Sequence, residues 1–347
     1  MKGNALTFQT ASPHVMDALI KPEHGRSELR LVRVKRPSPD NGQVVLEVFG
    51  GGLCGTDLHI LEDEYPSNAP VTLGHEISGI VRRLGPDVDP NWQDARVAVE
   101  SFFSTCEQCP ACVSGNRNLC PQRQSIGSHT HGGFAEELLI PVRNLHRLPS
   151  GLDIHAAALL EPLGCVVNCI MDPGRIQGGD RVLVTGPGPV GLLAAQVARG
   201  AGGLVVVAGT SADEARLDVA VRLGFKVAVV GQDDVGSADV AIECSGNPAA
   251  TTMCLERLVP RGQLLQVGLF GRSVSVPLDL ICSKGLTYSS AIAAPTHAWR
   301  RALTLVESGV VQLEPLVSEV VPLRDWERAF QAVRESSALK FVFDPHL

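Results

Sequence analysis

The spacing of hydrophobic positions changes at about residue 180. Before residue 150, short β-branched runs such as Gln43 to Phe49 and Arg96 to Glu100 are separated by Gly and Pro turns, which predicts a β-rich part. From about Asp180, short apolar strands alternate with helical stretches, which predicts βαβ units on a parallel sheet covered by helices on both faces. In chain order these segments are RVLVT (181–185), VGLLAAQVARGAG (190–202), LVVVAG (204–209), ADEARLDVAVRLG (212–224), VAVV (227–230), DVAIECSG (239–246) and QLLQVGL (263–269).

The C-terminal part returns to strand-like texture after one more helix. A helix is predicted over Ala298 to Gly309, and strands over 317–323 (VSEVVPL) and 339–343 (LKFVF). We expect this tail to rejoin the first, β-rich part. At 347 residues the chain exceeds a typical single domain, which favours two domains.

Composition narrows the class of protein. Hydrophobic residues make up 44% and charged residues 19%, which is typical of a globular enzyme rather than a disordered chain. The net charge of −7 offers no basic face for nucleic acid, so no nucleic-acid partner is expected. The start, MKGNALTFQT, lacks a signal-peptide pattern, and no stretch reaches the ~18 apolar residues of a membrane span. We expect a cytoplasmic protein with a small-molecule substrate.

A glycine-rich turn joins the first predicted strand of the second part to a helix. The turn reads Gly186-Pro187-Gly188-Pro189-Val190-Gly191, which is GxGxxG in the strand-turn-helix setting of dinucleotide-binding folds. Such glycines permit a tight turn and close approach to a pyrophosphate, while the helix N-terminus supplies partial positive charge. A later strand end at the same sheet edge offers backbone contacts to the nicotinamide half. The residues expected at the cofactor here are Gly186, Gly188, Pro189, Val190, Gly191, Val267, Gly268 and Leu269.

The end of the second strand bears on the choice of cofactor. An acidic residue there binds the ribose 2′-hydroxyl of NAD, but this strand ends in Gly209, Thr210 and Ser211. Small residues with nearby hydroxyls and the cation Arg216 admit a 2′-phosphate, so NADP is favoured over NAD. Two alternatives stay open: Arg216 lies on a solvated helix face, or Asp213 reaches the ribose.

Four of the ten cysteines lie in one short segment. Cys106, Cys109, Cys112 and Cys120 form CxxCxxCx₇C, and tetrahedral zinc takes four such thiolates. Four protein ligands leave no open position, which predicts a structural zinc ion that holds a loop without its own core. An iron–sulfur cluster is the lower-ranked alternative, because nothing else in the sequence indicates electron transfer.

A second set of potential metal ligands is spread along the chain. Cys54 stands in GGLCGTDLH, His75 and Glu76 in GHE, and Glu161 in LLEPLG. One Cys, one His and one carboxylate would give a catalytic zinc ion three protein ligands and one open position. From spacing alone, the favoured interpretation is a small core residue for Cys54 and a surface turn for the His-Glu pair, because that is what such residues usually are.

The order of these motifs resembles a known family. C-G-T-D-x-H, G-H-E, the four-cysteine cluster, E-P-L and the glycine turn together resemble the zinc-containing medium-chain dehydrogenase/reductase superfamily over nearly the whole chain. Glu161 in E-P-L and the run RVAVE resemble the sorbitol, threonine and butanediol dehydrogenase branch. The segment from Ser101 to Thr105 departs from that branch's usual proline-glycine segment, which leaves the substrate open.

The resemblance implies a catalytic metal site. Cys54 and His75 are expected to bind the catalytic zinc ion, with Glu161 as third ligand either directly or through water. Glu76 is expected beside the metal, where it replaces a ligand during turnover. Asp57 is expected to orient His75.

The resemblance also implies a proton relay. Thr56 matches the hydroxyl that takes the alcohol proton, and His59 matches the imidazole that passes the proton outward.

Two other pairs of potential ligands are assigned structural roles. Cys165 and Cys169 lie four apart on one helix face and are expected in the core, and His129 and His131 are expected in a turn.

The expected fold is α/β with two domains. A GroES-like β-rich catalytic domain spans 1–162 and is completed by 306–347, and a Rossmann domain with a doubly wound parallel sheet spans 163–305, with the active site between them. The expected reaction is hydride transfer between NAD(P) and a secondary alcohol, such as a polyol, sugar or amino alcohol, giving the ketone. The alternatives are an NADPH-dependent ketone reductase and a non-catalytic NADPH-binding protein. A homodimer or homotetramer is expected.

Overall fold

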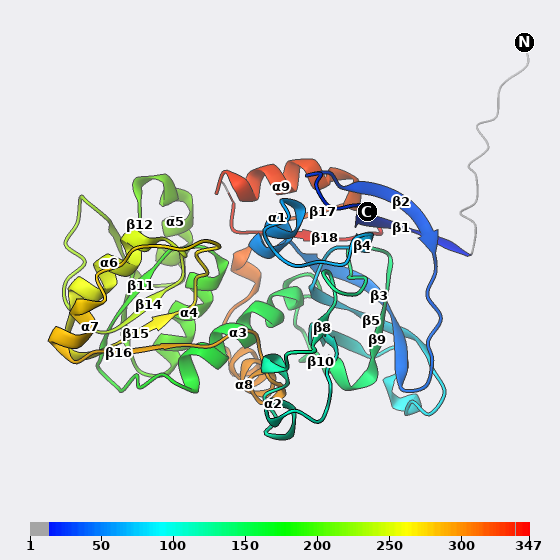
Figure 1. Ribbon diagram of the computed structural model, residues 1–347, viewed down its shortest axis with the longest axis horizontal. Helices are drawn as coiled ribbons and strands as arrows, with labels where there is room; N and C mark the ends of the chain where they lie inside the picture. The colour runs from blue at the N-terminus through cyan, green and yellow to red at the C-terminus, as the bar shows by residue number, and fades with distance from the viewer. Residues whose placement is uncertain (1–13, 337) are drawn as a thin grey trace, which may run out of the picture.

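The computed structural model describes residues 14–336 and 338–347. The start of the chain, MKGNALTFQT, whose pattern predicts no signal peptide, lies outside the described residues. Two lobes lie side by side, a parallel sheet with its helices on the left and a β-rich lobe on the right of Figure 1. The long α3 (Leu160–Met171) lies where the lobes meet (Figure 1).

The β-rich lobe is built around β3 (Gln43–Gly52), whose inward positions are apolar and buried. This strand pairs antiparallel with β5, β9 and β18, which gives a seven-stranded sheet of order β10-β6-β5-β3-β18-β17 with β9 off the path. The other strands of the lobe are β1 (Val15–Lys21), β2 (Arg30–Lys35), β4 (Val71–Thr72), β5 (Glu76–Leu84), β6 (Arg96–Val99), β7 (Phe102–Ser104), β8 (Gln124–Ser125), β9 (Glu137–Pro141), β10 (Leu145–Arg147), β17 (Val317–Val321) and β18 (Lys340–Phe343).

Short helices connect these strands. They are α1 (Gly55–Leu61), α2 (Pro110–Val113) and α9 (Trp326–Arg334), with the 3₁₀ turns η1 (Pro90–Trp92), η2 (Arg117–Leu119), η3 (Val142–Asn144), η4 (Ala156–Leu159), η6 (Glu314–Leu316) and η7 (Leu323–Asp325). The tail strands β17 and β18 pair with each other in parallel, and β18 pairs with β3. The C-terminal tail therefore completes the first lobe's sheet, while the exact domain boundaries stay a prediction.

The second lobe is a six-stranded parallel sheet of order β13-β12-β11-β14-β15-β16. This is the doubly wound order in which a dinucleotide site forms at the carboxyl ends of the strands. Separate apolar clusters fill its two faces, so helices cover both. The elements are β11 (Arg181–Thr185), α4 (Pro189–Gly200), β12 (Leu204–Gly209), η5 (Ser211–Asp213), α5 (Glu214–Arg222), β13 (Lys226–Val229), β14 (Ala238–Glu243), α6 (Pro248–Arg257), β15 (Leu258–Gln266), α7 (Asp279–Lys284), β16 (Thr287–Ser290) and α8 (Thr296–Glu307).

The predicted α/β class with a β-rich lobe and a Rossmann lobe is confirmed. The helix predicted from Ala298 begins two residues earlier, at Thr296, because Pro295 precedes its first turn. The edge strand β16 was absent from the predicted set, since its TYSS sequence is polar and half exposed. Within the described ranges, no helix combines the length and apolar character needed to cross a bilayer.

Candidate active site

Three potential metal ligands meet where β3 ends and β5 begins. Cys54 follows β3 and is the N-cap residue of α1, while Glu76 opens β5 and pairs with Gly52 of β3. His75 immediately precedes Glu76. One ligand atom from each of Cys54, His75 and Glu76 lies within 4.8 Å of the others. A thiolate, an imidazole and a carboxylate at this spacing fit the donor set of zinc.

Asp57 holds two parts of this cluster in place. Its carboxylate is fully buried and accepts hydrogen bonds from the backbone N–H groups of Cys54 (3.0 Å) and Gly74 (3.3 Å). The same carboxylate lies 3.6 Å from Nδ1 of His75. Asp57 therefore has the position expected of a residue that orients the His75 imidazole.

Glu76 is bound by a lysine that the sequence analysis missed. Lys340 Nζ lies 2.9 and 2.7 Å from the two carboxylate oxygens of Glu76 and donates to the Leu53 carbonyl oxygen at 2.9 Å. Burial lowers the pKa of Lys340, but the charges of Glu76, Cys54 and Asp57 and the hydrogen bonds to Glu76 together outweigh it, so the pKa is raised. The signal available in the sequence was a lysine within the apolar run LKFVF, because a buried lysine requires a partner.

Glu161 lies on the wall of the same cavity, outside the compact group of three. A cavity of about 320 Å³ is lined by Cys54, His75, Glu76 and Glu161. Ser101 Oγ donates to Glu161 at 3.3 Å, and burial raises the pKa of Glu161. Cys165, one helical turn later, has its Sγ 3.9 Å from the Glu161 carboxylate.

The four residues assigned to core or turn have mixed surroundings. Cys165 packs against the core and also lines the cavity, whereas Cys169 is buried. His129 and His131 lie in the turn around β8 and β9, where their Nδ1 atoms accept from the backbone N–H groups of Ser125 (3.4 Å) and Thr72 (3.2 Å).

The two residues expected in a proton relay lie at different depths. Thr56 lines the cavity, with its hydroxyl 3.6 Å from the sulfur of Cys54. His59 lies one turn along α1 with 46% of its side chain exposed, and its Nδ1 is 2.6 Å from a carboxylate oxygen of Glu64. Thr56 therefore faces the candidate metal cluster, and His59 faces solvent.

The glycine turn lies at the cofactor side of the cavity. Gly186 has a φ of +86°, and a Cβ there would lie 2.8 Å from Ser245. A Cβ on Gly191 would lie 1.9 Å from the Gly186 carbonyl oxygen, whereas one on Gly188 would meet no protein atom within 4 Å. Two glycines are thus required by packing and the third faces open space. Both Pro189 and Val190 line the cavity.

Strand β12, the second strand of the parallel sheet along the chain, ends beside the glycine turn. A Cβ on Gly209 would lie 2.9 Å from Pro187, so the strand end packs closely against the turn. The backbone N–H and hydroxyl of Thr210 donate to Asp213 at 2.9 and 2.8 Å, while Ser211 is exposed. The Asp213 carboxylate is therefore engaged in capping η5.

Arg216 joins the two lobes. Its guanidinium donates to the Ala338 carbonyl oxygen at 2.8 and 3.2 Å and lies 3.6 Å from Asp213. It also lines the cavity, and burial lowers its pKa. The solvated helix face considered above is therefore not its environment.

A third strand end completes the cofactor side. The N–H groups of Val267 and Gly268 donate to the Glu243 carbonyl oxygen at 2.8 and 2.9 Å. The Glu243 carboxylate accepts from the N–H groups of Ser245 (2.7 Å) and Gly246 (3.0 Å), which fixes the turn after β14. Both Val267 and Leu269 line the cavity.

Comparisons with known proteins match both lobes. Residues 40–150 match the alcohol dehydrogenase GroES-like domain, and residues 189–308 match the zinc-binding dehydrogenase family. The sorbitol dehydrogenase of Halalkalibacterium halodurans is 36% identical over 95% of this chain and 99% of its own length. The D-arabitol-phosphate dehydrogenase of Enterococcus avium is 29% identical over 95% and 97%. The chain belongs to the zinc-containing medium-chain dehydrogenase/reductase superfamily.

Solved structures agree with this assignment. A Sinorhizobium meliloti 1021 protein described as a zinc-binding dehydrogenase, bound to NADP, superposes with a TM-score of 0.86 at 29% identity. The match covers 95% of this dehydrogenase and 99% of that chain. The predicted family and fold are therefore confirmed.

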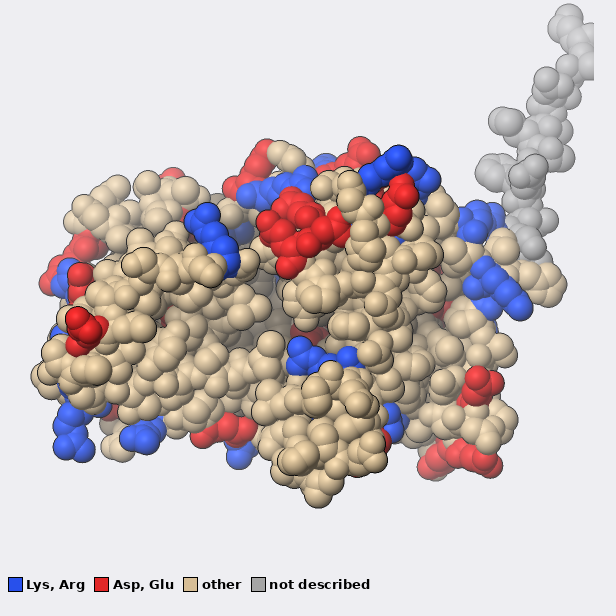
Figure 2. All heavy atoms as spheres, in the orientation of Figure 1, with Lys and Arg blue, Asp and Glu red and all other residues tan. Residues whose placement is uncertain are grey.

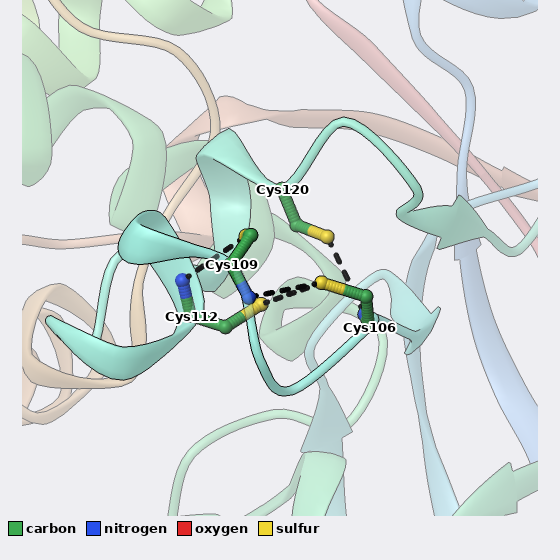
Figure 3. Close-up of side chains that lie close together, drawn as sticks. All are labelled: Cys106, Cys109, Cys112 and Cys120. Atoms are coloured by element: carbon green, nitrogen blue, oxygen red, sulfur yellow. Dashed lines mark hydrogen bonds between the residues drawn. The ribbon is translucent and has the colours of Figure 1, made fainter.

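We call the segment from Cys106 to Cys120, which carries the ligands predicted for a structural zinc ion, the four-cysteine lobe. The sulfurs of Cys106, Cys109, Cys112 and Cys120 lie within 4.8 Å of one another. Figure 3 shows the four side chains gathered in one place. Backbone N–H groups point at these sulfurs: that of Cys109 donates to Cys106 at 3.3 Å and that of Cys106 to Cys120 at 3.4 Å. Such bonds from Gln108 and Cys109 lower the pKa of Cys106 to about 6. Four convergent thiols fit a closed zinc site.

Proposed function

We propose that the chain is a zinc-dependent oxidoreductase that moves a hydride between a secondary alcohol and NAD(P), with the ketone as the oxidised product. The observation that carries this proposal is the convergence of Cys54, His75 and Glu76 on a cavity that Pro189 and Val190 of the glycine turn also line. The two curated relatives are named for sorbitol and D-arabitol phosphate, which supports a polyol substrate.

Two groups would perform the chemistry when bound at the proposed site. Cys54, His75 and a carboxylate of Glu76 or Glu161 would hold a zinc ion, which would supply Lewis-acid polarisation of the alcohol or carbonyl oxygen. The glycine turn would hold a nicotinamide cofactor, which would supply the hydride acceptor or donor. Cys106, Cys109, Cys112 and Cys120 would hold a second, structural zinc ion.

The chain's own residues position the substrate and move its proton. In our proposal the Thr56 hydroxyl, on the cavity wall beside Cys54, takes the proton of the substrate hydroxyl. His59, on the exposed side of α1, exchanges that proton with solvent. Asp57 keeps the His75 imidazole oriented, and Lys340 balances the negative charge of Glu76 on the cavity wall.

We propose NADP rather than NAD as the preferred cofactor. Gly209 carries no acidic group to repel a 2′-phosphate, and Asp213 is engaged with Thr210. Arg216 lines the cavity next to this strand end, where a guanidinium is suited to a phosphate. Initial rates with NAD and NADP, for wild type and Arg216→Gln, test this proposal: the variant is expected to lose rate with NADP and to keep it with NAD.

The alternative of a reductase running chiefly from ketone to alcohol uses the same site. The strand end at Gly209 favours it, through the same preference for NADPH. Rates in both directions with each cofactor distinguish the two. The predicted homodimer or homotetramer also stays a proposal, which light scattering tests.

The metal assignment is tested by Cys54→Ser. We expect kcat to fall at least about a hundredfold, because several kcal/mol of transition-state stabilisation depend on the metal. The bound zinc should fall from about two to about one ion per chain, and the cofactor Kd should stay within about threefold of wild type. Metal analysis, steady-state kinetics and cofactor fluorescence measure these changes.

The matched control is Cys282→Ser, because Cys282 is exposed on α7. It should keep wild-type activity and zinc. Normal turnover by Cys54→Ser would show that the reactive metal lies elsewhere. About one zinc ion in the wild type, retained in Cys54→Ser, would favour a non-catalytic NADPH-binding protein.

A further inference from the structure

One wall of the active-site cavity takes no part in the proposed metal site or cofactor site. It is formed by Phe102 at the start of β7 and by the segment around β8. The side chains that this wall contributes to the cavity are Phe102, Arg123, Ser125, Ile126 and Ser128. The wall is therefore apolar at Phe102 and Ile126, and carries one cation and two hydroxyls.

Arg123 is a half-buried cation without a carboxylate partner in the described part of the chain. Its guanidinium donates to the Asn118 carbonyl oxygen and lies 5.7 Å from the centroid of the Phe102 ring. Within residues 14–336 and 338–347, no Asp or Glu oxygen lies within the 4.0 Å of an ion pair with it. The guanidinium is held by one backbone oxygen and one ring, which leaves most of its donors free.

Each of the other two cations that line the cavity has a carboxylate within 4.0 Å. Lys340 lies 2.7 Å from a Glu76 oxygen, and Arg216 lies 3.6 Å from Asp213. In the four-cysteine lobe, which precedes Arg123 in the chain, Arg117 is paired with Glu107 at 3.0 Å. Arg123 therefore stands apart from its neighbours as a positive charge that faces the cavity and not a protein anion.

The surroundings of Arg123 suit an anion with several acceptor oxygens. Ser125 and Ser128 line the cavity beside it, and Ser128 Oγ lies 3.0 Å from Nδ1 of His129. Burial and the charge of Arg123 lower the pKa of His129, so its ring is neutral and holds Ser128 in place. On the face seen in Figure 2, basic side chains lie beside the hollow between the lobes, above the cysteine lobe.

This wall adjoins the reacting end of the cavity. Ser101, which donates to Glu161 at 3.3 Å, directly precedes Phe102, and the Phe102 ring packs against Arg123. Because Cys54, His75, Phe102 and Arg123 line one cavity, a substrate whose hydroxyl lies at Cys54 and His75 can extend past Phe102 toward the guanidinium. Such a substrate has an alcohol at one end and an anion at the other.

We propose that Arg123, with the hydroxyl of Ser125, binds an anionic group of the substrate, and that the substrate is a phosphorylated polyol. The inference rests on the proposed function and names the substrate class of that site. Arginine presents a planar fork of donors that matches two oxygens of a phosphate, and the Ser125 hydroxyl supplies a further donor for its remaining oxygen. A carboxylate offers two acceptor oxygens and one negative charge, fewer than the three oxygens and nearly two charges of a phosphate group.

The test compares matched substrates in the zinc-loaded holoenzyme. The probes are sorbitol, sorbitol 6-phosphate and the sugar acid gluconate, each assayed for kcat/KM with wild type, Arg123→Gln and Arg123→Lys. We expect sorbitol 6-phosphate to be preferred over sorbitol at least about tenfold by wild type. Arg123→Gln should lower kcat/KM for the phosphate about 10- to 100-fold and leave that for sorbitol within about threefold.

Two further readouts separate recognition from a structural role. Arg123→Lys, which keeps the charge and loses the fork, should recover part of the loss for the phosphate. Inorganic phosphate should inhibit wild type competitively against the polyol and should inhibit Arg123→Gln much more weakly. The control Arg143→Gln removes an exposed arginine that pairs with Glu107 outside the cavity. It should change neither the preference for sorbitol 6-phosphate over sorbitol nor the inhibition by inorganic phosphate.

Three results would overturn the inference: no preference for the phosphate in wild type, a preference for gluconate over sorbitol 6-phosphate, or an equal loss for both polyols in Arg123→Gln. Turnover of sorbitol without a phosphate preference leaves the proposed function intact and rejects this inference alone. If no polyol is oxidised, the polyol substrate of the proposed function is rejected, and calorimetric binding of sorbitol 6-phosphate to wild type and Arg123→Gln still decides whether the anion site exists.

Discussion

Two buried lysines position the elements around the candidate metal cluster. Lys21 on β1 lies 2.7 Å from Asp63 and donates to the carbonyl oxygens of Ile60 and Leu61 at the end of α1. Lys340 on β18 pairs with Glu76 at the start of β5. Because a buried ammonium is costly unless it is paired, each lysine fixes the element that carries its partner. The helix that follows Cys54 and the strand that follows His75 are both held this way.

The Glu76–Lys340 pair gives a prediction at this scale. Lys340→Met should lower the free energy of unfolding by about 3–5 kcal/mol, because it leaves the buried Glu76 charge without a partner. Urea unfolding measures the change. The control Lys226→Met removes an exposed lysine at the start of β13 and should stay within about 0.5 kcal/mol of wild type. A loss of less than 1 kcal/mol for Lys340→Met would show that Glu76 is stabilised by other groups.

Among elements, the glycine turn separates packing from ligand approach. Gly191→Ala places a Cβ 1.9 Å from a backbone oxygen and should lower stability by more than about 2 kcal/mol. Gly188→Ala places its Cβ in open space where the pyrophosphate is proposed to lie, so stability should stay within about 0.5 kcal/mol while the cofactor Kd rises. Urea unfolding and cofactor fluorescence measure both. Unchanged cofactor binding by Gly188→Ala would place the pyrophosphate away from this turn.

The four-cysteine lobe is an element without an apolar core. Its larger hydrophobic side chains face solvent, with Val113 76% and Leu119 54% exposed. Cys109→Ser should therefore remove about one zinc ion per chain and lower the melting temperature by several degrees. Metal analysis and calorimetry measure this outcome, with Cys282→Ser as the comparison. An unchanged zinc content would contradict the proposed closed site.

For the whole molecule, the C-terminal tail is part of the first lobe's core. Phe343 on β18 is fully buried and meets Phe134 edge to face, with ring centroids 4.8 Å apart. Phe343→Ala should lower the free energy of unfolding by about 3–5 kcal/mol, because it removes buried apolar surface and leaves a cavity in the core. The control Leu347→Ala changes an exposed residue. Equal stability of the two variants, measured by urea unfolding, would show that the tail docks only weakly.

Local sequence determined much of this protein. The glycine turn, the four-cysteine spacing and the alternation of strands and helices each depend on residues close together in the chain, where backbone geometry allows few outcomes. These motifs predicted the Rossmann lobe and the convergent thiols. The family resemblance singled out Cys54 and His75 as ligands of a second metal, with Glu161 as the third ligand and Glu76 beside the metal.

Only the tertiary structure decided which groups meet. Strand pairing of β3 with β5 and β18 places Glu76, rather than Glu161, in the compact group with Cys54 and His75, and brings Lys340 to its side. The cavity position of Arg123 likewise follows from packing against Phe102. Contacts between distant segments depend on sheet register and the burial of charge, and no local pattern in the sequence encodes either.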